Sequence, residues 1–130
     1  FLGYYHIPSG EVCYANAGHH LPLCMNPSGM IRKFGTATGA PLGISEAMKY
    51  TEGKDSLQPN ETLILFTDGF PEARTSSGEF LNEDRFGEFL KDQARSSVEE
   101  LCKRIFAQVW DFQQQKLADD LTILALRRLS

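Results

Sequence analysis

The sequence predicts an α+β fold, an α-β-β-α sandwich in which two antiparallel sheets pack face to face with helices outside them. Short turn clusters separate the β-prone stretches of the first half, which favours antiparallel hairpins. Two later stretches, residues 62–67 and 121–126, are apolar at successive positions, as in strands covered on both faces. The amphipathic helices come late, at 83–94 and 97–115, so they can cover a sheet from outside.

The first half of the chain predicts two hairpins. Four β-prone stretches are separated by clusters rich in glycine, proline and serine, residues that suit tight turns. The stretches cover residues 1–7, 11–16, 21–25 and 30–34. Pro-Ser-Gly at 8–10 closes the first pair, and Asn-Pro-Ser-Gly at 26–29 closes the second. We expect the four stretches to form an antiparallel meander.

A long loop and two more strands follow. Residues 35–46 hold three glycines and a proline, which predicts a loop. Residues 48–57 are polar and alternating, as expected of an exposed or edge strand. A Pro-Asn-Glu turn at 59–61 then leads into the apolar stretch 62–67. Both faces of that strand are expected to be covered by other layers.

Two amphipathic helices are predicted between the two apolar strands. In 83–94 and in 97–115 the apolar side chains recur at a spacing of three or four residues. The second helix begins with a capping box, in which Ser97 is the N-cap residue and Glu100 stands at the third helical position. The apolar positions are Phe86, Phe89, Leu90, Val98, Leu101, Cys102, Ile105, Phe106, Val109 and Phe112. Residues 121–126 complete the fold as a second strand covered on both faces.

The composition describes one ordinary globular domain over residues 1–130. Of the residues 42% are hydrophobic and 23% charged, and the formal net charge is −4 with the basic side chains scattered. No basic stripe follows a nucleic-acid backbone, and no apolar run approaches the ~20 residues that cross a bilayer. The three cysteines form no Cys-x-x-Cys or Cys/His cluster, which argues against structural zinc and indicates a reducing, cytoplasmic compartment. The chain starts without methionine inside a strand-like pattern, so we expect a piece of a longer protein.

Acidic residues stand at the ends of the two apolar strands. Asp68 directly follows the stretch 62–67, and Asp119 and Asp120 directly precede 121–126. If these strands are antiparallel neighbours, the carboxylates meet at one end of the sheet, where a cation would offset their like charges. Without histidine or cysteine nearby, Mg²⁺ or Mn²⁺ is the ion expected. The pleat turns Asp119 and Asp120 to opposite faces, so only one would point at the ion.

Simpler structural roles stay open for these residues and their neighbours. The three aspartates are alternatively turn residues, since Asp-Gly after a strand is a common turn. His19 follows a glycine that breaks a strand pattern, and we interpret it as a hydrogen-bonded structural histidine rather than a metal ligand or general acid. Glu72 either reaches an additional ion or is a plain surface charge. Arg74 either steadies its loop or, as we interpret it, lies on the surface.

Four motifs in order cover nearly the whole chain. They are Tyr-Ala-Asn-Ala-Gly-His-His-Leu-Pro at 14–22, Gly-Ala-Pro-Leu-Gly at 39–43, Phe-Thr-Asp-Gly-Phe-Pro-Glu-Ala-Arg at 66–74 and Ala-Asp-Asp-Leu-Thr at 118–122. Together they resemble the bacterial branch of the metal-dependent PPM (type 2C-like) serine/threonine phosphatases, the branch of RsbU and stage II sporulation protein E. The resemblance implies an α-β-β-α sandwich that holds Mn²⁺ or Mg²⁺, two ions per complete domain. It also implies that a metal-activated water attacks phosphoserine or phosphothreonine in line, with no phosphoenzyme.

The resemblance assigns roles to particular residues. It implies that Asp68 and Asp119 are metal ligands. Glu72 falls where some relatives have an acidic ligand for a third, looser ion. Asp120 falls where many relatives carry asparagine, which places it beside the ligands rather than among them. Residues of the structural signatures are Asn16, Gly18, His19 and Gly69.

The resemblance also implies that part of the domain lies outside this chain. Family members carry, upstream of every motif seen here, an aspartate-bearing segment that bridges the two ions, and helices that cover one sheet. We therefore expect residues 1–130 to be the C-terminal portion of a phosphatase domain. Such a fragment would be impaired as an enzyme and prone to self-association or homodimer formation through the uncovered sheet.

The sequence leaves two functions open, a phosphatase and a protein-binding module. The resemblance implies a phosphorylated regulatory protein as substrate, such as an anti-sigma factor antagonist, and hence a role in signal transduction. The rival is a non-catalytic phosphatase-like module that binds a partner protein. The presence of Asp68 and Asp119 favours the enzyme, and absence of the bridging aspartate from the whole protein would favour the module.

Overall fold

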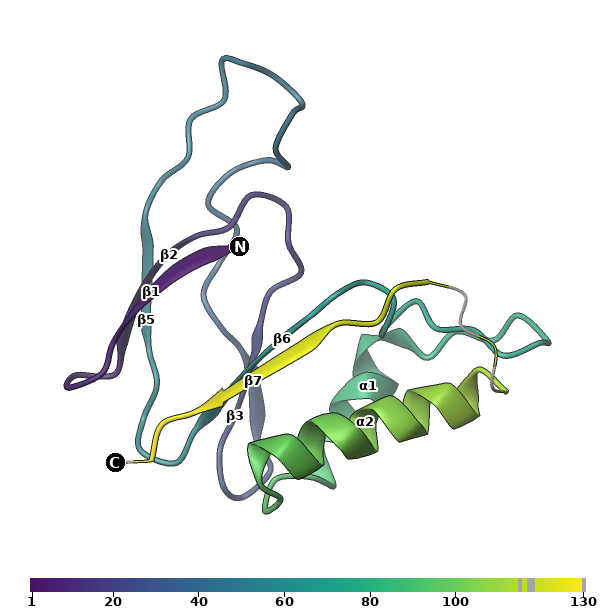
Figure 1. Cartoon of the computed structure of the whole chain (residues 1–130). Helices are drawn as coiled ribbons and strands as arrows, with labels where there is room; N and C mark the ends of the chain where they lie inside the picture. Colours follow the sequence, from purple (N-terminus) through teal and green to yellow (C-terminus); the bar gives the residue numbers. More distant parts are fainter. Residues whose placement is uncertain (115, 117–118, 130) are drawn as a thin grey trace.

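Antiparallel sheets of three and four strands form the framework of the chain in the computed structural model, which describes residues 1–114, 116 and 119–129 (Figure 1). The three-stranded sheet has the order β1-β2-β5, and the four-stranded sheet has the order β4-β3-β6-β7. The strands are β1 (Leu2–His6), β2 (Glu11–Ala15), β3 (Leu23–Met25), β4 (Ile31–Lys33), β5 (Gly53–Ser56), β6 (Thr62–Phe66) and β7 (Ile123–Arg127). As predicted, helices α1 (Asn82–Lys91) and α2 (Val98–Phe112) stand between β6 and β7 in the chain.

Both predicted hairpins form, but they belong to different sheets. β1 pairs with β2 across a turn in which Gly10 has a φ of 78°, a conformation that favours glycine. β3 pairs with β4 across the second turn. Because β2 and β3 are not neighbours, the prediction of one continuous meander is wrong. Residues 16–22, with Gly18 at φ 91°, instead carry the chain from one sheet to the other.

The polar stretch at 48–57 gives a short edge strand. Only its second half, β5, is paired, and it borders β2 with Ser56 opposite Glu11. Residues 41–50 are exposed and belong to a loop that projects from the sheets (Figure 1). The predicted edge position is confirmed. The strand is shorter than the stretch because alternation of polar residues does not mark where strand pairing stops.

The two apolar strands pair with each other, but only one is covered on both faces. β6 lies between β3 and β7 and is almost entirely buried. β7 forms an edge of its sheet, and Leu124 is 56% exposed. Full coverage of the last strand was therefore a wrong prediction, because an apolar run does not reveal whether its strand ends a sheet. The antiparallel register, with Phe66 opposite Ile123, places the end of β6 beside the start of β7.

The helices begin and end near their predicted limits. The Ser97 side chain accepts a hydrogen bond from the Glu100 backbone N–H at 3.2 Å, so the predicted N-cap of α2 is confirmed. α2 ends at Phe112, short of the predicted end at Gln115, which lies outside the described residues. None of the helices in the described part of the chain is long and apolar enough to cross a membrane.

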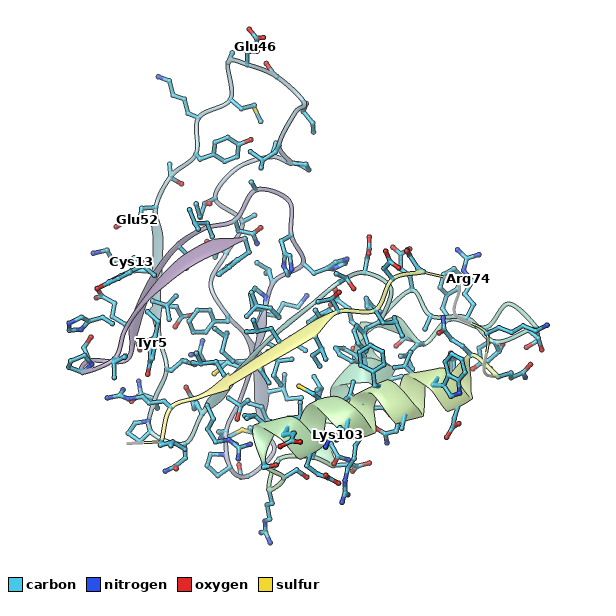
Figure 2. The ribbon with its side chains drawn as sticks, viewed as in Figure 1. Tyr5, Cys13, Glu46, Glu52, Arg74 and Lys103 are labelled. Atoms are coloured by element: carbon cyan, nitrogen blue, oxygen red, sulfur yellow. The ribbon has the colours of Figure 1, made fainter. Side chains whose placement is uncertain are left out.

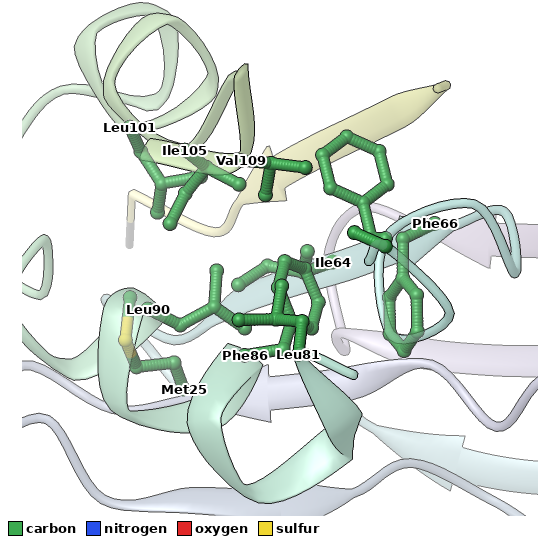
Figure 3. Close-up of a cluster of buried hydrophobic side chains, with 11 residues drawn as sticks. Met25, Ile64, Phe66, Leu81, Phe86, Leu90, Leu101, Ile105 and Val109 are labelled. Atoms are coloured by element: carbon green, nitrogen blue, oxygen red, sulfur yellow. The ribbon is translucent and has the colours of Figure 1, made fainter. Parts of the chain in front are cut away.

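Two apolar cores hold the layers together. The larger core lies between the four-stranded sheet and the helices and includes Ile64, Phe86 and Ile105, each fully buried (Figure 3). The second core lies between the two sheets and includes Val12 and Leu63. The described residues thus stack as a helical layer, a sheet and a second sheet, in agreement with the predicted sandwich of antiparallel sheets.

The outer face of the three-stranded sheet is predicted to make the isolated chain self-associate. Leu2 is 77% exposed and Tyr4 68%, and with Cys13 and Ala15 they line a shallow hollow. Exposed apolar surface of this kind favours association, so sedimentation of residues 1–130 is expected to show a dimer or larger species. Tyr4→Lys should shift the population towards monomer. A clean monomer of the unmodified chain, with no binding of an apolar dye, would contradict this prediction.

A charge cluster between the sheets is predicted to make the fold sensitive to acid. Asp55 of β5 accepts hydrogen bonds from the Arg32 guanidinium of β4 at 2.9 Å and from the Gly35 backbone N–H at 2.8 Å. Burial raises the pKa of Asp55, but these bonds and one from the Ser56 backbone outweigh burial, so the pKa is lowered. The stability that this carboxylate provides is therefore present above its ordinary pKa of about 4 and is lost as the pH falls through the lowered pKa.

Unfolding by denaturant, followed from about pH 6 to pH 2, measures this contribution. Asp55→Asn is expected to lower the free energy of unfolding near neutral pH by about 1–3 kcal/mol and to flatten its fall in acid. Glu46 is exposed, so Glu46→Gln serves as a control that should leave the curve unchanged. If the free energy of unfolding of Asp55→Asn falls as steeply in acid as that of the unmodified chain, the Asp55 carboxylate is not what makes the fold sensitive to acid.

Candidate metal centre

Hydrogen bonds tie the end of β6 to the segment before β7. The Thr67 backbone N–H donates to the carbonyl oxygen of Thr122 at 3.1 Å, which continues the strand pairing beyond β6. The Thr67 hydroxyl accepts from the Thr122 backbone N–H and donates to the carbonyl oxygen of Asp120, each at 3.0 Å. Thr67 and Asp120 are 53 positions apart in the sequence, and these bonds place them side by side.

The loop after β6 turns tightly against that segment. The Glu72 backbone N–H donates to the carbonyl oxygen of Asp68 at 2.9 Å and closes the turn. Gly69 is buried, and a Cβ atom there would lie 2.6 Å from the carbonyl oxygen of Asp120. Any other residue would force the two segments apart. The Asp-Gly turn therefore brings the acidic residues of the loop to the edge where β7 begins.

A pocket of about 230 Å³ opens at this edge. Its lining residues are Gly69, Glu72, Arg74, Gln113 and Asp119. The structure thus brings together two of the acidic residues predicted for the site, Glu72 and Asp119. Asp68 is exposed on the same turn but does not line the pocket. Within the described residues, no group of three or more His, Cys, Asp or Glu side chains converges to hold a metal ion.

The neighbouring residues Asp119 and Asp120 lie differently relative to the pocket. One carboxylate oxygen of Asp119 accepts a hydrogen bond from the Asp120 backbone N–H at 2.7 Å, which orients the carboxylate. Asp120 is bonded to Thr67 through its carbonyl oxygen, and its exposed side chain does not line the pocket. Of this pair, only Asp119 faces the pocket.

The acidic groups that line the pocket suit a hard divalent cation in kind. Glu72 and Asp119 offer carboxylate oxygens, the ligands that Mg²⁺ and Mn²⁺ prefer. Two carboxylates that share a pocket repel each other, and a divalent cation would offset that repulsion. Since Mg²⁺ takes about six ligands and keeps several waters, two carboxylates can form only part of its ligand shell.

The Asn-Ala-Gly-His segment forms a bonded loop distinct from the pocket. Asn16 is 1% exposed, and its side-chain amide both donates to the carbonyl oxygen of His19 and accepts from the His19 backbone N–H, each at 2.9 Å. The His19 ring donates from Nδ1 to the carbonyl oxygen of His20 at 2.6 Å. A Cβ atom on Gly18 would lie 2.6 Å from Pro41. These residues hold the loop together and do not line the pocket.

Two further residues of the pocket were not identified from the sequence. The sequence suggests a surface charge for Arg74, and Arg74 is exposed, but the residue also lines the pocket, and its guanidinium stacks on Phe80, 4.1 Å from the ring centroid. Figure 2 shows Arg74 at the end of the molecule where α2 ends. Gln113 is 3% exposed just beyond α2. A polar residue after an amphipathic helix gives no sequence signal of burial, so the pattern offered no way to find Gln113.

Comparison with sequences of known proteins gives one family. The family model described as Stage II sporulation protein E (SpoIIE) matches residues 1–129. "Phosphoserine phosphatase RsbU" from Bacillus subtilis (strain 168) is 30% identical over 128 residues, a match that covers 98% of this chain and 38% of RsbU. The chain therefore spans less than half the length of this relative.

Solved structures share the fold. The RsbU and RsbW domains of Rv1364c from Mycobacterium tuberculosis superpose with a TM-score of 0.77 at 26% identity, covering 98% of this chain and 35% of that chain. The Mn-presoaked phosphatase domain of SpoIIE from Bacillus subtilis gives a TM-score of 0.75 at 15% identity, covering 97% of this chain and 54% of that chain. These likenesses confirm the predicted sandwich of antiparallel sheets.

Proposed function

This chain belongs to the Stage II sporulation protein E (SpoIIE) family of PPM phosphatases, and we propose that residues 1–130 form the C-terminal portion of a phosphatase domain. The proposed reaction is hydrolysis of phosphoserine or phosphothreonine on a regulatory protein. The observation that carries the proposal is the pocket at the joint of β6 and β7, where Glu72 and Asp119 meet beside the Asp68 turn. The name of the relative RsbU, a phosphoserine phosphatase, supports the same reaction.

The carboxylates at the joint are the proposed ligands for Mn²⁺ or Mg²⁺. Asp68 and Asp119 hold the ions of the centre, Glu72 serves a third, looser ion, and Asp120 lies beside the ligands. When bound, such ions supply a Lewis acid for the phosphoryl group and lower the pKa of water. The protein's own contribution is to hold the ligand side chains in place. The Asp120 backbone N–H orients Asp119 at 2.7 Å, and the Thr67 hydroxyl anchors the same segment at 3.0 Å.

The proposed substrate is a phosphorylated regulatory protein, such as an anti-sigma factor antagonist. A relative of known structure, Rv1364c, carries an RsbU domain together with an RsbW domain, which supports a role in regulation. We place the reaction in the cytoplasm because Cys13, Cys24 and Cys102 are all free thiols, as is usual in a reducing compartment.

A non-catalytic module that binds a partner protein is the second candidate. The observation in its favour is that the described residues bring only two carboxylates to the pocket. Phosphate release from a phosphoserine protein by the full-length protein, with and without Mn²⁺, separates the candidates. Mn²⁺-dependent release supports the phosphatase, and binding of the phosphoprotein without release supports the module.

The isolated chain is predicted to be a poor enzyme. Residues 1–130 should hydrolyse a phosphoprotein or an aryl phosphate far more slowly than the full-length protein, because the ligand set in the pocket is incomplete. Mn²⁺-dependent initial rates of the two proteins, at equal concentration, check this expectation. Equal rates would show that residues 1–130 contain the whole active centre and that no upstream aspartate is required.

A further inference from the structure

β4 forms a free edge of the four-stranded sheet. Among the described residues it pairs with β3 alone. The Phe34 backbone N–H donates to the carbonyl oxygen of Pro22 at 2.7 Å, and in an antiparallel ladder such bonded residues alternate with residues whose backbone groups point outward. Ile31 and Lys33 occupy the outward positions. β4 therefore offers their N–H and C=O groups to a further strand.

A groove of about 340 Å³ lies between β4 and α1, beside this free edge. Lys33 and Glu83 of α1 form an ion pair at 3.0 Å at one end, and at the other a Cβ atom on Gly29 would lie 3.5 Å from the carbonyl oxygen of Lys91. Helix α1 therefore runs alongside β4 in the opposite direction. The apolar residues that line the groove are the half-buried Leu21, Leu23 and Ile31 and the buried Phe66 and Phe86.

Gly87 keeps the helix side of the groove open. Phe86 and Leu90 of α1 pack with Met25 and Ile64 of the sheet (Figure 3), and Gly87 lines the groove. A Cβ atom on Gly87 would meet no other side chain and no other segment within 4 Å. Glycine weakens a helix relative to alanine, yet neither close packing nor a positive φ requires it here. The space beside Gly87 is thus available to a side chain of a ligand.

The charges around the groove leave one acidic group without a partner. Lys33 pairs with Glu83, and Lys91 pairs with Glu88. Asp84 also lines the groove, and among the described residues it forms no ion pair. The groove therefore has a net negative charge, which is complementary to a basic side chain on a bound segment.

A second copy of the chain fits this edge poorly. If two copies paired through the outward groups of Ile31 and Lys33, Arg32 of one copy would lie directly opposite Arg32 of the other. Like charges directly opposite each other destabilise an antiparallel pair. The edge therefore favours a strand from a different protein.

We propose that the groove between β4 and α1 binds an extended segment of the phosphorylated substrate protein, which adds to the sheet as a strand beside β4. This inference rests on the proposed phosphatase function. The groove is close to the proposed metal centre, since Phe66 lines it and Asp68 follows two positions later on the turn after β6. The bound segment carries an apolar side chain beside Gly87 and a basic side chain near Asp84.

Steady-state kinetics of the full-length protein with Mn²⁺ test the proposal on two substrates, the phosphoserine form of an anti-sigma factor antagonist and p-nitrophenyl phosphate. Gly87→Leu fills the groove, so the ratio of kcat/KM for the phosphoprotein to kcat/KM for p-nitrophenyl phosphate should fall about tenfold or more. Ala107 is exposed on α2, so Ala107→Leu is a matched control that should keep the ratio of the unmodified protein. An unchanged ratio in Gly87→Leu would overturn the proposal.

Lys33→Pro tests strand addition itself. Proline removes the outward N–H of residue 33, which the sheet does not use, and proline is tolerated on edge strands. The same ratio should fall about fivefold. Lys33→Ala loses the ion pair with Glu83 but keeps the N–H, so it should lower the ratio less. Equal losses in the two variants would assign the effect to the ion pair and overturn strand addition.

Stability separates docking from a structural role. Leucine forms helices better than glycine, so the melting temperature of Gly87→Leu should be no lower than that of the unmodified protein. A lower melting temperature, or equal losses of kcat/KM on both substrates, would show that another part of the protein fills the groove and would overturn the proposal. Absence of Mn²⁺-dependent phosphate release from both substrates by the unmodified protein would reject the proposed function itself. Normal release with an unchanged ratio in Gly87→Leu and Lys33→Pro would reject only this inference.

Discussion

Asparagine in place of Asp68 or Asp119 is expected to lower the Mn²⁺-dependent rate of phosphate release by about 10²–10⁴-fold in the full-length protein. A factor of this size corresponds to about 3–5 kcal/mol of lost transition-state stabilisation. The reason is that each change removes one negative oxygen ligand from a site at the joint of β6 and β7. Asp119 lines the pocket there, and Asp68 stands on the turn that follows β6.

Asp120→Asn is the matched control, since it makes the same chemical change one position away. Our proposal places Asp120 beside the ligands rather than among them, with its carbonyl oxygen bonded to the Thr67 hydroxyl, so the rate is expected to fall much less. Excess Mn²⁺ should partly restore the two ligand variants, because weakened binding is offset by mass action, but it would not restore an unfolded protein. If Asp120→Asn proves the most damaging while Asp119→Asn stays near the unmodified rate, the assignment of the two aspartates is wrong.

Phe86→Ala is expected to lower the free energy of unfolding by about 3–5 kcal/mol. Phe86 is fully buried between α1 and the four-stranded sheet, with its ring centroid 4.8 Å from that of Phe66 and 5.4 Å from that of Phe70. Alanine removes the apolar contacts and leaves a cavity that the neighbouring rings cannot fill. Urea unfolding of the isolated chain, compared with the unmodified sequence, measures the loss.

Phe106→Ala is the control for this loss of aromatic contact. Phe106 is 37% exposed on α2, and its ring meets Phe70 edge-on at 5.6 Å. Alanine there removes less buried area, so the loss should be at most about half of that for Phe86→Ala. Equal losses at the two positions would mean that the core between sheet and helices does not depend on Phe86 as the structure indicates.

The elements that could be predicted from the sequence are those fixed by local chemistry. The turn clusters at 8–10 and 26–29 close hairpins, and Ser97 caps its helix, because these signals depend on residues within a few positions. The wrong predictions concern how the strands are arranged in the sheets. Which sheet a hairpin joins, and whether Leu124 lies in the middle or at the edge of a sheet, depends on contacts between distant segments.

Some residues of the candidate site could likewise be predicted from the sequence, and others could not. The approach of the loop after β6, which carries Asp68 and Glu72, to Asp119 follows from the antiparallel pairing of two apolar strands, a pattern that the sequence displays. That Glu72 rather than Asp68 lines the pocket with Asp119 depends on how this loop turns. Gln113 and Arg74 could not be assigned to the pocket. Their place there depends on where α2 ends relative to the loop after β6, which only the packed structure defines.

Direct Mn²⁺ binding tests, without reference to activity, whether Asp68 and Asp119 hold a divalent cation. The electron paramagnetic resonance signal of free Mn²⁺, recorded as the full-length protein is added, gives the affinity and the number of bound ions. We expect the unmodified protein and Asp120→Asn to deplete free Mn²⁺ alike, and the double variant Asp68→Asn/Asp119→Asn to lose at least one bound ion while remaining folded. A double variant that binds Mn²⁺ in the same number and with the same affinity as the unmodified protein would contradict the claim.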